Sequence, residues 1–370
     1  MICANKPAVV LAPMEGVTDA PMRALMGELG GFTLAVSEFL RVSQVVPGPR
    51  VFMRHVPELL TGSRTPTGLP VVVQLLGGDA GRMAEAAAVA ASLGAAAIDI
   101  NFGCPAKTVN RHDGGATLLK YPGRIREIVR AVRAAVPGHI PVSAKLRLGW
   151  DDITSIDENA AMAAEGGASW LTIHGRTRAA GYAPPVFWEP IGRVRERLGI
   201  PVIANGDIRT VADFRRCREV TGCLHFMIGR GALADPRLAW SIAHELGLCP
   251  SGPPALGECD WVVWLRRLVD WAAVYKTSSC PRTVHRLKQW LSYANRFGRF
   301  DGFERVKRAE TIEDFFAALA ASSRRLTAVS GTVGEHPGED GNPAEQSVPR
   351  PATEDGRSAA EVAPQCRAVW

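Results

Sequence analysis

Short apolar runs recur along the first two thirds of this 370-residue chain, and their number and spacing limit the folds that it can adopt. Each run has the length of a β-strand and is bounded by polar residues, glycine or proline. Eight such runs occur, at residues 9–12, 33–36, 71–75, 97–101, 142–146, 170–173, 201–204 and 225–228. The sequence therefore predicts eight strands.

Segments of helical character lie between most of these runs. They include residues 82–93, 125–136, 157–165, 191–198 and 211–220. Strands that alternate with helices form βαβ units with parallel pairing. Eight units within about 230 residues favour a (β/α)8 barrel over an open, doubly wound sheet. A dinucleotide-binding fold of that open type also requires a glycine-rich turn after its first strand, where this chain has PMEGVTD instead.

The character of the chain changes twice after the barrel. We assign residues 1–246 to the barrel and residues 247–259, rich in Gly and Pro, to a linker. Residues 260–328 predict a small helical domain, and we expect residues 329–370, rich in Gly, Pro, Glu and Ser, to be disordered. One face of the first helix in this domain carries apolar residues at core spacing, namely Trp261, Trp264, Leu265, Leu268 and Trp271.

Charge is distributed unevenly along the chain. The formal net charge is +6, and residues 329–370 hold seven acidic residues and three arginines, a net of −4. The remaining residues, 1–328, therefore carry +10. This excess favours a polyanionic partner, although a solvated basic surface without a function has the same composition.

Cysteine spacing and hydropathy argue against several protein classes. The eight cysteines form no CxxC pair, which disfavours a zinc site or a disulfide framework and indicates a reducing compartment. We therefore expect no metal ion. The first twenty residues do not look like a signal peptide, and no uncharged apolar stretch reaches 18 residues. We expect a cytoplasmic protein that does not contact the membrane.

Polar residues end nearly every predicted strand. In a (β/α)8 barrel the catalytic groups lie at these carboxyl ends and on the loops that follow. Burial gives a barrel strand no reason to end in lysine, histidine or glutamine, so we interpret the set as one site. In chain order it comprises Glu15, Glu38, Gln74, Asn101, Cys104, Lys145, Arg147, His174, Asn205, Asp207 and Arg230.

The loops after the last two strands indicate a phosphate site. They read ANGD and MIGRGA, and glycines at such positions let backbone N–H groups approach phosphate oxygens. Arg230 can donate two hydrogen bonds to a phosphate. Glycines that only form tight turns are the alternative. We expect a phosphorylated ligand.

Lys145, which lies within a predicted barrel strand, suggests what this ligand is. Beside the N1–O2 edge of a flavin its ammonium would stabilise the reduced ring, and Gln74 can hydrogen-bond the polar edge of that ring. From these residues alone, a Schiff-base lysine remains an alternative. His174 is expected to contact the cofactor, with a purely structural histidine as the alternative.

Cys104 lies between Gly103 and Pro105, just beyond the fourth predicted strand. A thiol with a pKa of roughly 8.5 is largely protonated at neutral pH and can act as a general acid. The glycine permits close approach of a ligand, and the proline stiffens the loop. Lone cysteines are usually buried apolar residues, yet this one follows a strand end, so we predict that it donates a proton.

Nine segments between residues 9 and 233 resemble the tRNA-dihydrouridine synthases and occur in the order of that family. They are LAPMEGVTD, SEFLRV, VVVQLLG, DINFGCPAKTVN, GGATLL, AKLRLGWDD, TIHGRTRAAGY, PVIANGDI and MIGRGAL. The resemblance implies an FMN enzyme that uses NADPH. It also implies that reduced flavin sends a hydride to C6 of a uracil, and that Cys104 protonates C5.

The resemblance further implies roles for individual residues. Those that would hold the flavin ring are Pro13, Met14, Glu15, Gln74, Lys145 and His174. Those that would hold its ribityl phosphate end are Asn205, Gly206, Asp207, Gly229 and Arg230. Positions near the target uridine are matched by Arg41, Asn101 and Arg176.

A further segment, HRLKQWLSYA at 285–294, resembles the helical domain of the branch that reduces uridine 16 in the D-loop of tRNA. Residues 282–308 hold eight basic and two acidic residues, a net of +6. We therefore expect Arg282, Arg286 and Lys288 to contact tRNA phosphates, with an ordinary solvated helix face as the alternative. The target base would leave its stack to reach the flavin. We expect a monomer with no stable protein partner.

Two other functions compete with this interpretation. An FMN barrel that oxidises or reduces a free pyrimidine, of the dihydroorotate dehydrogenase type, explains the barrel and the cysteine but not the basic helices. A tRNA-binding protein without turnover is disfavoured by the presence of Cys104, Lys145 and Arg230.

Overall fold

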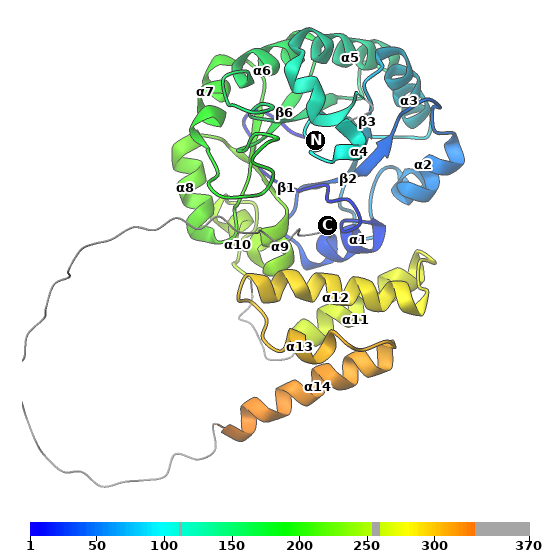
Figure 1. Ribbon diagram of the computed structural model, residues 1–370, viewed down its shortest axis with the longest axis vertical. Coiled ribbons are helices and arrows are strands. Elements are labelled where there is room, and N and C mark those ends of the chain that lie inside the picture. The colour runs from blue at the N-terminus through cyan, green and yellow to red at the C-terminus, as the bar shows by residue number, and fades with distance from the viewer. Residues whose placement is uncertain (111–112, 254–259, 330–370) are drawn as a thin grey trace, which may run out of the picture. The chain divides into compact units, whose positions relative to one another are not determined.

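The computed structural model describes residues 1–110, 113–253 and 260–329. Eight parallel strands close into one barrel in chain order, because β8 pairs with β1, and the helices form a ring around them (Figure 1). The strands are β1 (Ala8–Leu11), β2 (Leu34–Arg41), β3 (Val71–Leu76), β4 (Ile98–Asn101), β5 (Val142–Arg147), β6 (Trp170–His174), β7 (Val202–Asn205) and β8 (His225–Ile228). The prediction of a (β/α)8 barrel is confirmed.

Helices follow the strands as the sequence predicts. They are α1 (Ala20–Leu29), α3 (Ala80–Ser92), α5 (Pro122–Ala135), α6 (Ile156–Glu165), α7 (Glu189–Arg197), α8 (Val211–Thr221), α9 (Arg230–Ala234) and α10 (Leu238–Glu245). The loops add α2 (Pro49–His55), α4 (Lys107–Asn110) and two 3-10 helices (Pro57–Thr61, Gly115–Lys120). Side-chain caps start several of them: Asp19 accepts from the backbone of α1, and Thr210 and Asp213 form a capping box on α8.

Strand β2 is longer than its apolar run at 33–36 predicts. The strand continues to Arg41, because pairing with β3 resumes at Phe39 after a register shift beyond Val36. A bulge of this kind disrupts the alternation of apolar residues along a strand. The apolar run therefore marks only the first half of β2, and its second half, with Glu38, leads towards the carboxyl end of the barrel.

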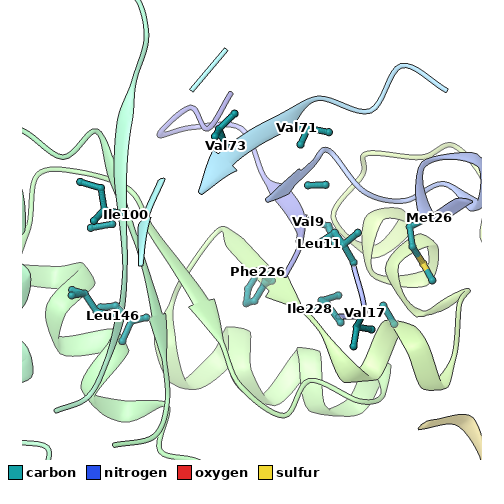
Figure 2. Close-up of a cluster of buried hydrophobic side chains, with 14 of the residues drawn as sticks. Val9, Leu11, Val17, Met26, Val71, Val73, Ile100, Leu146, Phe226 and Ile228 are labelled. Atoms are coloured by element: carbon teal, nitrogen blue, oxygen red, sulfur yellow. The ribbon is translucent and has the colours of Figure 1, made fainter. Parts of the chain in front are cut away.

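Strand side chains alternate between the outside and the inside of the barrel. On the outer face Val9 and Leu11 of β1 lie beside Phe226 and Ile228 of β8, with Met26 of α1 nearby (Figure 2). The intervening residues form a separate cluster, to which none of the described helices contributes. This inner cluster fills the barrel near the amino ends of its strands and includes Val10, Leu34, Val72, Trp170, Ile203 and Met227.

Further helices follow the barrel: α11 (Asp260–Val274), α12 (Cys280–Arg296), α13 (Phe303–Val306) and α14 (Ile312–Val329). Helix α11 packs against α1 and α12 packs against α9, and the barrel and helices α11 to α13 belong to one compact unit, Met1–Ser322. Trp264, Leu265 and Leu268 are buried in α11, as the predicted apolar face requires.

The domain boundaries at residues 246, 260 and 328 stay predictions. The second half of the expected linker, residues 254–259, and the expected disordered tail from residue 330 lie outside the described residues. Within the part of the chain that the structure describes, no helix is both long enough and apolar enough to cross a membrane.

Candidate active site

Inside the barrel, side chains change from apolar near the amino ends of the strands to polar near the carboxyl ends. On β3, for example, Val72 belongs to the inner cluster and Gln74 follows it on the same face. The same alternation directs a set of predicted site residues inward, namely Gln74, Asn101, Lys145, Arg147, His174 and Asn205. The strand register then aligns them laterally, since Asn101 pairs with Lys145, and His174 pairs with both Arg147 and Asn205.

A chain of hydrogen bonds shapes the turn that carries Cys104. The side-chain oxygen of Asn101 accepts from the backbone N–H groups of Gly103 and Cys104, each at 2.9 Å. Asn101 Nδ2 donates to Gln74 Oε1 at 2.9 Å, and Gln74 Nε2 donates to Asp99 Oδ2 at 2.7 Å. Both amide side chains are thus engaged within the protein, and together they orient the Cys104 turn.

Asp99 is not among the site residues that the sequence predicts. It lies on the inner face of β4, only 2 % exposed, and its second carboxylate oxygen accepts from Ser143 Oγ at 2.6 Å. Burial raises the pKa of this carboxyl group above its ordinary value. A charged residue within the apolar stretch AAIDIN was the available signal, because burial of a lone carboxylate requires such partners.

The Cys104 thiol is nearly enclosed. The residue is 9 % exposed and packs with Leu76 and Val109. Burial raises the pKa of the thiol above its ordinary value, although the nearby cations of Arg147 and Lys145 oppose this shift. The thiol is therefore protonated at neutral pH, as a proton donor must be.

Arg147 ties the Cys104 turn to the loop after β6. The sequence places it at a strand end but assigns it no role. Its Nε donates to the carbonyl oxygen of Gly103 at 2.8 Å, and its Nη1 donates to those of Thr177 at 3.1 Å and Gly181 at 2.7 Å. The side chain is buried, so it fixes the wall of the site behind the thiol.

Tyr182 is a candidate site residue that the sequence prediction missed. Its ring centre lies 5.1 Å from the guanidinium carbon of Arg147 and 4.8 Å from that of Arg230, and it packs edge-on to His174 at 6.1 Å. The residue is 46 % exposed, so it presents an aromatic ring at the mouth of the barrel. Its only sequence signal is its place in the segment TIHGRTRAAGY.

Lys145 and His174 have polar groups that no described residue satisfies. Burial and the neighbouring Arg147 cation lower the pKa of Lys145 to about 8, and no described residue accepts a hydrogen bond from its ammonium group. Burial and the neighbouring cations of Arg147 and Lys145 lower the pKa of His174 well below its ordinary value, so its imidazole is neutral. His174 Nδ1 is buried without a partner among the described residues. Both groups are available to a bound ligand.

Asp207, in the loop directly after β7, forms ion pairs with three arginines. Both terminal nitrogens of Arg176 donate to its carboxylate, and Arg209 Nη2 and Arg230 Nη2 each donate at 2.9 Å. Although burial opposes it, the hydrogen bonds and charge of Arg176 hold the pKa of Asp207 below its usual range. The Arg176 side chain is fully buried, whereas that of Arg230 is 25 % exposed and can also reach a ligand.

The two predicted phosphate loops are tightly packed at their glycines. Gly206 has a φ of +128°, and a Cβ there would lie 2.9 Å from Val186 Cγ2. A Cβ at Gly229 would lie 3.2 Å from Met14 Sδ, which places the loop after β8 against the loop after β1. In that loop Pro13 and Met14 are half-buried and Glu15 is exposed.

The residues predicted to contact RNA differ in their availability. Arg41 is exposed and donates one hydrogen bond, to Thr108 O at 3.2 Å. Arg282 is exposed and Lys288 is half-buried. In contrast, the Arg286 side chain is only 13 % exposed and its guanidinium hydrogen-bonds within the protein. No cluster of His, Cys, Asp and Glu residues suited to a metal ion occurs among the described residues.

Comparison with known proteins places this site in a family. The family described as Dihydrouridine synthase (Dus) matches residues 10–302. A protein of Cupriavidus necator named tRNA-dihydrouridine(16) synthase is 47% identical over 77% of this chain and 87% of its own length. Proteins of the same name from Shewanella oneidensis (47% identical; 86% of this chain, 99% of the relative) and Neisseria meningitidis serogroup B (41% identical; 85% and 95%) match similarly. The chain therefore belongs to the dihydrouridine synthase family, whose members are FMN-dependent oxidoreductases.

Proposed function

We propose that this protein reduces uridine 16 of tRNA to 5,6-dihydrouridine. The names of its relatives indicate this reaction and this position, and the chain spans 87% to 99% of the length of the three relatives described above. One structural observation carries the proposal. A protonated, nearly enclosed thiol is held beside a barrel interior whose lysine and histidine have unsatisfied polar groups.

These unsatisfied groups fit a flavin ring. The pyrimidine edge of a flavin offers hydrogen-bond acceptors and a donor, which complement the Lys145 ammonium and the buried His174 Nδ1. The residues that would hold the ring are Pro13, Met14, Glu15, Gln74, Lys145 and His174. When bound in its reduced form, FMN supplies the hydride that adds to C6 of the uracil.

The loops after β7 and β8 would hold the ribityl phosphate end. Their glycines expose backbone N–H groups, and the partly exposed Arg230 supplies a cation that its pairing with Asp207 keeps in place. Asp207 itself would act through Arg230, since a carboxylate would repel a phosphate. The full set is Asn205, Gly206, Asp207, Gly229 and Arg230.

Cys104 would hold a proton at Sγ and transfer it to C5 of the uracil. The burial that raises the pKa of the thiol keeps this proton in place until the base arrives. Asn101 and Arg147 position the thiol through the backbone of its turn. Tyr182 offers an aromatic surface at the mouth, against which an extruded base can pack.

Arg41 at the carboxyl end of β2, and Arg282 and Lys288 on α12, would contact the RNA. The net charge of +6 over residues 282–308 supports this role, because phosphate contacts supply most of the affinity for folded RNA. The buried Arg176 is paired with Asp207 and would position that carboxylate rather than touch RNA. We also propose NADPH as the electron donor, a monomer as the active form, and the cytoplasm as its location.

The test is a reconstituted reaction. The protein, supplied with FMN and NADPH, is incubated with an unmodified tRNA transcript, and dihydrouridine is mapped by nucleotide position. We expect product at position 16 and none in a transcript that carries cytidine there. Product at another position would overturn the assignment of uridine 16, whereas flavin binding without any product in tRNA would favour a free pyrimidine as substrate.

A further inference from the structure

Helix α12 contacts the loop after β1, which also carries three of the residues proposed to hold the flavin ring, through a side chain that the sequence assigns to RNA binding. Arg286 projects from α12 towards the loop after β1, where its Nη1 donates to the carbonyl oxygen of Gly16 and its Nη2 to that of Val17. Its Nη2 also pairs with the Asp19 carboxylate at 2.8 Å. The guanidinium therefore has little capacity left for a phosphate.

The same loop is held from two other sides. Arg23, which is fully buried in an ion pair with Glu58, donates to the carbonyl oxygen of Thr18 at 2.7 Å. Three successive carbonyl oxygens, at residues 16, 17 and 18, are thus bound by two guanidinium groups. From β2, the Glu38 carboxylate accepts from the Val17 N–H at 3.0 Å.

The position of this loop determines the position of Met14. The Met14 carbonyl oxygen accepts from the backbone N–H groups of Val17 and Thr18, each at 2.9 Å, and the Met14 N–H donates to Thr18 Oγ1 at 2.8 Å. Residues 14–18 therefore form a closed turn. A displacement of the Gly16 and Val17 carbonyl groups would therefore also displace Met14. The thioether of Met14 lies next to Gly229.

Helix α12 also contacts the adjacent segment of the barrel, since β8 pairs with β1. Trp290, one turn after Arg286, is 1 % exposed, and its Nε1 donates to the carbonyl oxygen of Leu233 at 2.9 Å. Leu233 belongs to α9, the helix that begins with Arg230 directly after β8. One helix outside the barrel thus touches the loop after β1 and the helix after β8.

We infer that α12 stabilises the flavin site, and that Arg286 is a positioning residue for the loop after β1 rather than an RNA contact. This inference rests on the proposed flavin site. Charge-assisted hydrogen bonds to a loop restrict its conformations before the ligand binds, and such preorganisation increases affinity. The helical region would then contribute to flavin binding as well as to RNA binding.

The test compares flavin and RNA binding in matched variants. Flavin is removed from the protein, and FMN binding is measured by quenching of flavin fluorescence. We expect Arg286→Ala to weaken FMN binding about tenfold or more. The FMN affinity of Arg286→Lys should lie between those of Arg286→Ala and the wild type, because one ammonium group can replace only some of the hydrogen bonds of the guanidinium. Trp290→Phe, which keeps the packing but removes the N–H donor, should weaken FMN binding about threefold.

Arg282→Ala on the same helix is the matched control. We expect it to leave FMN binding unchanged and to lower the salt slope of tRNA binding by about 0.7–0.9, the value for one phosphate contact. Arg286→Ala should leave that slope unchanged. Hydrogen exchange provides a second measurement: residues 14–19 should exchange faster in Arg286→Ala, while β3 to β6 keep their wild-type rates, which distinguishes a local effect from unfolding.

Unchanged FMN affinity together with unchanged hydrogen exchange of residues 14–19 in Arg286→Ala would overturn the inference that Arg286 positions the loop after β1. A lower salt slope in the same variant would return Arg286 to the RNA surface. If the wild-type protein does not bind FMN, the proposed function fails, and the exchange experiment still decides whether Arg286 holds the loop.

Discussion

The surroundings of Cys104 determine the protonation state of its thiol. A thiol in water loses its proton near pH 8.5, but burial in this turn raises that value. The hydrogen bonds from its own N–H to Asn101, and from Arg147 to Gly103, fix the turn without using the sulfur. The sulfur is thus left to hold and transfer a proton.

At this scale we predict that Cys104→Ala retains FMN and loses activity. The substitution removes the proton donor but leaves the hydrogen bonds that Asn101 and Arg147 make to the backbone of the turn, so flavin affinity should stay within about twofold of wild type. Product formation in a single turnover should fall by about 10²- to 10⁴-fold, the usual contribution of a general acid. In the wild type, the rate should decline as pH rises through the raised thiol pKa, because the deprotonated thiol has no proton to give.

Cys3→Ala provides the control, since this cysteine is exposed and outside the site. It should retain wild-type turnover at every pH. Loss of flavin from Cys104→Ala would show that the cysteine is structural and would refute the prediction.

Among the elements, the loops at the ends of β6, β7 and β8 depend on one carboxylate. Asp207 follows β7 and pairs with Arg176, Arg209 and Arg230, which brings the three loops together. Removing one partner of a buried ion pair costs more than the pair itself contributes, because the remaining charge is left without compensation.

We predict that Asp207→Asn lowers the free energy of unfolding by about 2–4 kcal/mol. The neutral amide retains one hydrogen bond but leaves the buried Arg176 guanidinium without a counter-charge. Denaturant unfolding of the flavin-free protein measures the effect. Glu165→Gln, which breaks an exposed pair with Arg126 at 3.4 Å, should change stability by less than about 1 kcal/mol. Equal effects of the two substitutions would contradict the prediction.

At the scale of the whole molecule, the barrel and helices α11 to α13 share one compact unit. Besides the contacts of α12, Arg267 and Trp271 of α11 both donate to the Glu28 carboxylate on α1, at 2.7–2.9 Å. A rigid connection of this kind holds the basic surface of α12 at a constant position relative to the mouth of the barrel. An RNA bound to both surfaces would therefore present the same nucleotide to Cys104 each time.

We predict that Arg282→Ala combined with Lys288→Ala weakens tRNA binding and lowers its salt slope by about 1.4–1.8, as expected for two lost phosphate contacts. Titrations at several salt concentrations measure the slope. The control is Arg126→Ala combined with Arg130→Ala on α5, which removes the same charge from exposed side chains elsewhere on the barrel. If both double variants lose affinity equally, net charge rather than a specific surface binds the RNA.

The sequence by itself determined the barrel, because eight apolar runs separated by helical segments have few other ways to pack. It also predicts which end would hold the site, since Gln74, Lys145 and His174 lie towards the carboxyl ends of strands, where core residues are expected. These inferences depend on local periodicity, which can be read along one stretch of chain. The exception was β2, where a register shift hides the continuation of the strand.

Only the tertiary structure decided what the polar residues bind. From the sequence, Arg230 is expected to bind a phosphate, Arg176 to lie near the target uridine and Arg286 to contact tRNA. In the structure, Arg176 is fully buried against Asp207 and Arg286 binds the loop after β1. The partners of Asp99 and Tyr182, which make them candidate site residues, became visible only when the strands and loops were assembled. The reason is physical: residue type specifies what a side chain can bind, whereas its partner is set by contacts between segments far apart in the chain.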